Sequence, residues 1–236
     1  MDAGSGAAAR PQEDNSRVAD DWNAHAEREG ARYRDGVDRI PDDSEGRQRQ
    51  LTRMGNAAYG AGLAYLMVGD RGHAVEWLTR AAVTYRESYA DAPPASWGRL
   101  VAMIKASILA DDWESAEEYA RRTLEEGAAE AESPIARYAA ALAHLTLGDE
   151  EAARAAADSI RERDDFPGDV ADALATLAAE DVLGYTYAVE SVLESFEQRD
   201  EYLEEIPVAD TVLVLQALAR RHRMAADLAS PLLPPG

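Results

Sequence analysis

Apolar residues recur along this chain at the spacing of one helix face. In the stretch from Leu63 to Ala82, an apolar run ends at Gly69-Asp70 and a second apolar stripe follows, formed by Ala74, Trp77, Leu78 and Ala81. The spacing i, i+3, i+4, i+7 is that of a helix with one buried side. This stretch therefore predicts a helix, a tight turn and a second helix.

Three further copies of the pattern follow, after Asp112, after Asp149 and, more faintly, at Gly184. Their apolar stripes contain, in order, Ala116, Tyr119 and Ala120; Ala153, Ala156, Ala157 and Ile160; and Ala188 and Val192. From Asp70 through these positions the intervals are 42, 37 and 35 residues, which is the period of two-helix repeats. The pattern predicts an all-α fold of stacked antiparallel helical hairpins, an α-solenoid with about ten helices.

Breaks in the pattern divide the chain into a tail and one helical domain. Residues 1–15 are small, polar and aperiodic, so we expect them to be disordered, and residues 16–236 to form a single domain. The expected elements are a capping helix over 16–40, hairpins at about 45–90, 95–128, 133–164 and 168–204, a C-terminal helix over 207–224 and an extended tail over 229–236. We expect the capping helix to lay Trp22 and Tyr33 on the first hairpin, and the C-terminal helix to seal the end of the stack.

The first hairpin resembles the tetratricopeptide repeat. In that repeat a small residue and an aromatic on the first helix meet an alanine and a large apolar residue on the second, and Gly62, Tyr65, Ala74 and Leu78 stand at this spacing. The later hairpins hold other residues at the first-helix positions, so the chain as a whole is tetratricopeptide-like and not a true tandem array. The residues expected to carry the repeat packing are Gly62, Tyr65, Ala74, Trp77, Leu78, Ala116, Tyr119 and Ala153.

The charge balance excludes one class of partner. The chain has 45 acidic and 24 basic residues, a formal net charge of −21, and a single lysine, Lys105. Nucleic-acid binding requires a cationic face, so we expect no nucleic-acid partner. Acidic, nearly lysine-free chains resemble those of salt-accumulating halophilic archaea, and we interpret the charge as adaptation to concentrated salt. The alternative is an acidic face that docks a basic partner.

The sequence also bears on the compartment. There is no cysteine, so neither a disulfide nor a thiolate metal site can form. The N-terminus lacks the basic start and apolar region of a signal peptide, and no run of about 18 apolar residues could span a bilayer. We expect a cytoplasmic protein that does not insert into a membrane.

No catalytic motif stands out. The four histidines, His25, His73, His144 and His222, are scattered, and there is no zinc-protease helix, nucleophile elbow, phosphate loop or dinucleotide fingerprint. Carboxylate pairs are so frequent in this acidic chain that they carry no information about catalysis. We therefore expect no enzyme, no metal and no cofactor. An enzyme would require His25, His144 or carboxylates to converge in a pocket with perturbed pKa values.

Three residues stand out against the composition and are the candidate partner-binding residues. Trp97 follows a double proline at the start of the second hairpin, Arg99 comes two residues later, and Lys105 lies in an otherwise apolar segment. A structural interpretation is that Trp97 covers the hairpin and that Lys105 extends past the core to water. The functional interpretation is that these residues line a recognition groove, as helical repeats commonly provide.

The order of these signals resembles the Imm49 family of immunity proteins, which accompany the toxins of polymorphic toxin systems. The matching segments are VGDRGHAVEWLTRAAVTYRES in the first hairpin, APPASW before the second, AVESVLESFEQRDE, and LVLQALARRHRM leading into SPLLP, within roughly residues 50–235. A histidine associated with the helix at 188–198 is absent here, where Phe196 stands. The resemblance implies an all-α protein without catalysis that binds and neutralises a cognate toxin. The alternative is a tetratricopeptide-like scaffold or adaptor that binds a peptide or protein client.

Overall fold

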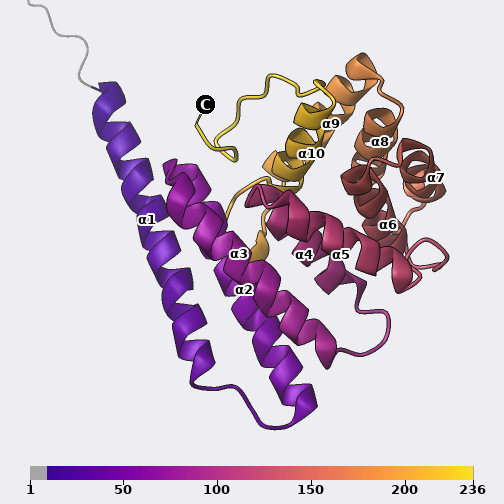
Figure 1. Ribbon diagram of the computed structural model, residues 1–236. Coiled ribbons are helices and arrows are strands. Elements are labelled where there is room, and N and C mark those ends of the chain that lie inside the picture. The colour runs from indigo at the N-terminus through magenta and orange to yellow at the C-terminus, as the bar shows by residue number, and fades with distance from the viewer. Residues whose placement is uncertain (1–9, 236) are drawn as a thin grey trace, which may run out of the picture.

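The predicted stack of helical hairpins is present. The computed structural model describes residues 10–235, and within them the chain forms ten α-helices, one 3-10 turn and no strand (Figure 1). The helices are α1 (Arg10–Val37), α2 (Ser44–Val68), α3 (Arg71–Ala90), α4 (Trp97–Leu109), α5 (Trp113–Glu125), α6 (Pro134–Leu147), α7 (Glu150–Arg161), α8 (Gly168–Ala178), α9 (Val182–Glu197) and α10 (Asp210–Arg221). The pairs α2–α3, α4–α5, α6–α7 and α8–α9 form the hairpins, and each hairpin packs against the next.

An aspartate begins the second helix of every hairpin. Asp70, Asp112, Asp149 and Asp181 each accept a hydrogen bond from the backbone N–H three residues later, at 3.1, 3.1, 3.2 and 3.0 Å. Such a cap satisfies a donor that the helix leaves unpaired and contributes about 1 kcal/mol. The fourth turn is therefore centred on Asp181, three residues before Gly184. Its stripe is Tyr185, Ala188, Val189 and Val192, all buried.

The residue before each capping aspartate has a left-handed backbone. This position is held by Gly69 (φ 83°) and Gly148 (φ 76°) in two turns, but by Asp111 (φ 61°) and Glu180 (φ 53°) in the others. For a residue with a Cβ, this conformation costs about 1 kcal/mol. We expect Glu180→Gly to raise the free energy of unfolding by about 1 kcal/mol in urea denaturation, and Glu180→Ala, which keeps the Cβ, to gain less. A Glu180→Gly protein less stable than the parent would show that backbone strain is not the dominant effect there.

The positions expected to carry the repeat packing form the core. Ala74, Leu78, Ala116 and Ala153 are completely buried, and Trp77 and Tyr119 are nearly so. Tyr65 is only half-buried and stacks on the His73 ring, with 5.0 Å between centroids. Gly62 lies against Leu78, since a Cβ at Gly62 would stand 2.6 Å from Leu78 Cγ. Close approach of α2 and α3 at this point therefore requires glycine.

The N-terminal helix covers the first hairpin, as predicted. Trp22 is buried, and the Tyr33 ring meets Trp77 edge-on at 5.7 Å. The helix starts earlier than expected, because α1 includes residues 10–15, which we predicted to be disordered. Pro11 is compatible with the first turn of a helix, and residues 12–29 contain neither glycine nor a further proline. The rest of the predicted tail, residues 1–9, lies outside the described residues.

The C-terminal part departs most from expectation. α9 ends at Glu197 instead of near residue 204, and α10 begins at Asp210 instead of 207. The segment between them includes a 3-10 turn, Leu203–Glu205, that lies beside α2. Glu204 in this turn forms an ion pair with Arg32 of α1. This segment thus returns the chain from the last hairpin to the first helices.

The last helix does not seal the end of the stack. α10 lies against α4, α8 and α9, toward the middle of the molecule (Figure 1). Its buried residues lie on more than one side of the helix, which suits a helix packed between others. They are Val212, Val214, Leu215, Gln216, Leu218 and Ala219. The tail after it is not helical, but it is not extended throughout as predicted, because the Leu233 N–H donates to the Ser230 carbonyl at 3.1 Å and closes a turn. Leu232 in this turn is buried, and its carbonyl accepts a hydrogen bond from the Ala209 N–H at 3.0 Å.

One further property concerns membranes. Across the described helices, none has both the length and the apolar character that crossing a bilayer demands.

Candidate functional site

Two of the three candidate partner-binding residues line one recess. Trp97 and Arg99, in the first turn of α4, open onto a hollow of about 610 Å³ where α4 meets α2, α3 and the start of α6. We call it the Trp97 recess; its lining residues are Thr52, Asn56, Tyr85, Ala95, Ser96, Trp97, Gly98, Arg99, Ala102, Ser133 and Ile135. Ile135 is 41% exposed and lies at the edge of the recess. The recess therefore has an apolar rim beside a guanidinium group.

Arg99 has only neutral partners. Its Nε donates to Thr52 Oγ1 at 3.0 Å and to Ser88 Oγ at 2.9 Å, and its Nη2 donates to the side-chain carbonyl of Gln48. Burial lowers the pKa of Arg99. No carboxylate of the described residues lies within ion-pair distance of it. Arg99 thus ties α4 to α2 and α3, and its charge is balanced by no nearby acid.

Lys105, the third candidate, lies elsewhere. Its side chain is only 12% exposed, so it does not extend freely into water as the structural interpretation expected, and it is not among the residues that line the Trp97 recess. Its Nζ donates to Asp210 Oδ2 at 2.6 Å and to Thr211 Oγ1 at 3.2 Å. The reason is that α10 packs over α4 and brings the Asp210 carboxylate to Lys105. The sequence pattern alone did not indicate that these two helices meet.

The Lys105 ion pair continues into a small buried network. The Tyr59 hydroxyl of α2 donates to the same Asp210 Oδ2 at 3.0 Å. Burial alone would lower the pKa of Lys105, but the attraction of Asp210 outweighs it and raises that pKa. Burial, and then Asp210, hold the pKa of Tyr59 well above its ordinary value. Lys105 is therefore charged and Tyr59 neutral, and together they fix α10 to α4 and α2.

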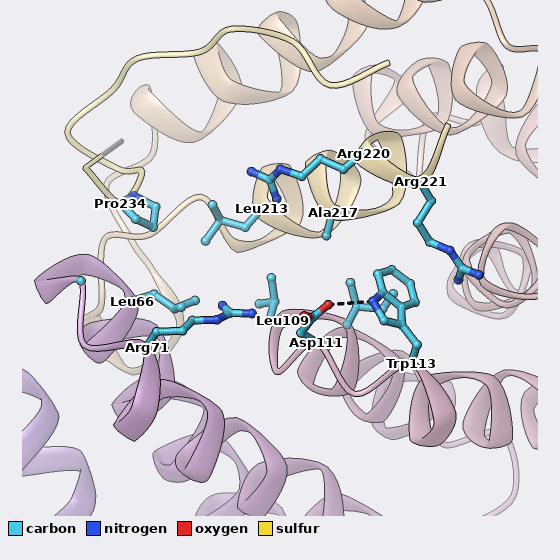
Figure 2. A pocket seen from close by; sticks show the side chains of 12 residues that line it. Leu66, Arg71, Leu109, Asp111, Trp113, Leu213, Ala217, Arg220, Arg221 and Pro234 are labelled. Carbon is cyan, nitrogen blue, oxygen red and sulfur yellow. Dashed lines mark hydrogen bonds between the residues drawn. The ribbon is translucent and has the colours of Figure 1, made fainter. Parts of the chain in front are cut away.

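A second recess, which sequence analysis missed, lies between the first two hairpin turns and α10 (Figure 2). It has a volume of about 570 Å³, and we call it the arginine recess. Its apolar lining is Leu66, Ile108, Leu109, Leu213, Ala217 and Pro234, and its charged lining is Arg71, Asp111, Arg220 and Arg221, with Trp113 at one end.

Its charged groups differ in how they are held. Arg221 is fixed in place, because its Nη1 donates to the Thr146 carbonyl at 3.2 Å and its guanidinium lies 4.4 Å from the centre of the Trp113 ring. The Trp113 Nε1 donates to Asp111 Oδ1 at 2.8 Å. Arg71 and Arg220 form no ion pair with any residue of the described chain, and they extend into the recess from facing walls (Figure 2).

The histidines do not converge. His25 Nδ1 contacts Arg28 at 2.7 Å and His73 Nδ1 contacts Asp70 at 2.7 Å. His144 lies 3.5 Å from Asp149, and His222 lies 3.6 Å from Glu180. Over residues 10–235, no set of three or more histidine or acidic side chains is arranged to hold a metal ion.

Comparison with known proteins adds no relative. No protein-family model, no curated protein and no solved structure matches this chain. The two recesses are therefore the features on which a proposal about function must stand.

Proposed function

We propose that this chain is a non-enzymatic protein-binding module that binds and neutralises a cognate toxin through the Trp97 recess. The observation that carries the proposal is the composition of the recess. It combines the half-buried Trp97, the exposed side chain of Ile135 and the guanidinium of Arg99, which forms no ion pair with the described residues. Tryptophan and arginine are the residues that most often dominate the energy of protein interfaces. That the partner is a toxin is supported by the resemblance to the Imm49 family.

The charge of the chain gives the partner a chemical description. A net charge of −21 attracts a partner that is basic overall and raises its rate of association at moderate salt. Within the recess, Arg99 favours a carbonyl or carboxylate oxygen of that partner, with an apolar group beside it against Trp97 and Ile135. A half-buried guanidinium is less screened by salt than a surface charge. The contact would therefore persist in concentrated salt.

The adaptor function is less well supported by the geometry. Stacked repeats bind clients on the extended surface that their helices line. Here α10 lies over α4 and α8 and is fixed to α4 by the Lys105–Asp210 ion pair. A client on that surface would have to displace α10, which is a covalent part of the same chain.

The proposal is tested by expressing the chain with the toxin encoded by its neighbouring gene. We expect cells to survive with the parent chain and with Leu183→Asp, and to die with Ile135→Asp, because an aspartate in the recess repels an acidic group and removes apolar contact. The affinity measured with purified proteins should fall roughly tenfold or more. Killing in the presence of the parent chain would refute the immunity role. Full protection by Ile135→Asp would refute the use of this recess.

The two variants are matched. Ile135 and Leu183 are each the second residue of their helix, α6 and α9, and are 41% and 65% exposed. An acidic residue in the first turn of a helix is favourable because it complements the helix dipole. Both variants should therefore remain folded, which circular dichroism can verify, and they differ only in which surface they alter.

A further inference from the structure

The arginine recess gathers positive charge on a strongly negative protein. Three guanidinium groups and one carboxylate line it, whereas the chain as a whole has a net charge of −21. The one carboxylate, Asp111, already accepts a hydrogen bond from Trp113. The recess therefore has more cationic than anionic groups, and an apolar floor beneath them.

Stability does not account for this arrangement. Arg71 is the first residue of α3, where a cation opposes the helix dipole and destabilises the helix slightly. Arg220 lies in the last turn of α10, where a cation is favourable, but it forms no ion pair with the described residues. The two guanidinium groups extend into the recess from facing walls (Figure 2), and neither has an acidic partner among the described residues.

We propose that the arginine recess binds a small organic anion, a carboxylate or phosphate monoester attached to an apolar body. The anionic group lies between Arg71 and Arg220, which can each donate charge-assisted hydrogen bonds to its oxygens. The apolar body lies on Leu109, Leu213 and Ala217. A volume of about 570 Å³ is within the range of small-molecule sites. This site shares no residue with the Trp97 recess, so anion binding here can be tested separately from the binding of a toxin there.

The Trp113 indole gives this site its own reporter. Its N–H donates to Asp111 at the edge of the recess, so its cross-peak in a nitrogen-15 NMR spectrum should shift when the recess fills. The cross-peak is assigned from its disappearance in Trp113→Phe. The probes are benzoate, phenyl phosphate and the neutral benzyl alcohol. We expect both anions to shift the peak saturably and benzyl alcohol, at equal concentration, to shift it far less. The tighter of the two anions identifies the group that the site prefers.

Variants locate the binding. We expect Arg71→Gln/Arg220→Gln to raise the dissociation constant for the preferred anion roughly tenfold or more, since it removes the charge-assisted hydrogen bonds. Arg34→Gln/Arg86→Gln, an equal loss of charge at exposed positions of α1 and α3, should change it less than about twofold. The double variant Arg71→Lys/Arg220→Lys retains both charges, so its dissociation constant should lie between those of the parent and of the double glutamine variant. No shift with either anion, or an unchanged dissociation constant in the double glutamine variant, would overturn the proposal.

Discussion

Substituting Lys105 by methionine is expected to lower the free energy of unfolding by about 3 kcal/mol. The variant leaves the Asp210 carboxylate, which is only 17% exposed, without the ammonium group that lies 2.6 Å away. A buried charge that loses its partner retains its desolvation cost and has little to offset it. The Tyr59 hydroxyl remains as a donor to Asp210 but carries no charge. Urea denaturation at pH 7 measures the effect.

Two further variants separate the ion pair from the bulk of the lysine. Lys105→Met/Asp210→Leu removes both charges and should recover most of the lost stability. It should remain about 1 kcal/mol less stable than the parent, because the Tyr59 hydroxyl loses its acceptor. Arg154→Met breaks the exposed pair with Asp158 in α7 and should cost less than about 1 kcal/mol. If Lys105→Met costs no more than Arg154→Met, the ion pair does not hold α10 in place.

The second large effect is expected where α2 crosses α3. Gly62→Ala should lower the free energy of unfolding by about 2 kcal/mol, although alanine is the better helix former by about 1 kcal/mol. The reason is steric, because the new Cβ would stand 2.6 Å from Leu78 Cγ and 2.9 Å from Leu78 Cδ2. Thermal and urea denaturation measure the change, and Gly98→Ala is the control, because a Cβ at Gly98 meets nothing within 4 Å.

A double variant identifies the cause of the Gly62 effect. Leu78 is completely buried, so Leu78→Ala alone should cost about 3 kcal/mol through the cavity it leaves. That cavity is where the Cβ added by Gly62→Ala would lie, so Gly62→Ala/Leu78→Ala should cost at least about 1 kcal/mol less than the sum of the singles. Strictly additive losses would mean that the clash with Leu78 is not what excludes a side chain at residue 62.

The hairpins were predictable because their signals are local. A capping aspartate and an apolar stripe four, seven, eight and eleven residues later are both contained in one helix, as at Asp70 and Asp149. The fourth copy was misplaced by three residues because Gly184 was taken as the equivalent of Gly69 and Gly148, the glycines of the first and third turns. The residue with the left-handed backbone in that turn is Glu180. Glutamate does not favour this conformation as glycine does, so the sequence gives no sign of it.

The position of α10 could not be predicted from the sequence. Its link to the stack joins residues 105 positions apart, and nothing local indicates which of 45 acidic residues faces Lys105. The presence of a lone lysine in an apolar helix was a usable signal for a buried ion pair, but it was interpreted as a surface feature.

The two recesses differ in the same way. Trp97 and Arg99 are two residues apart on one helix, so the sequence could indicate them together. The arginine recess is formed by two separate turns and α10, and two of its three arginines, Arg220 and Arg221, have a local explanation in the helix dipole. Only the three-dimensional arrangement brings their charges together.

The central claim, that a protein partner binds at the Trp97 recess, is tested most directly by amide hydrogen exchange of the chain alone and in complex with its partner. We predict slower exchange in the complex for residues 52–56, 95–102 and 133–137, which form the recess and its rim, and unchanged exchange for residues 182–187 on α9. Protection confined to residues 182–187, with the recess segments unaffected, would contradict it.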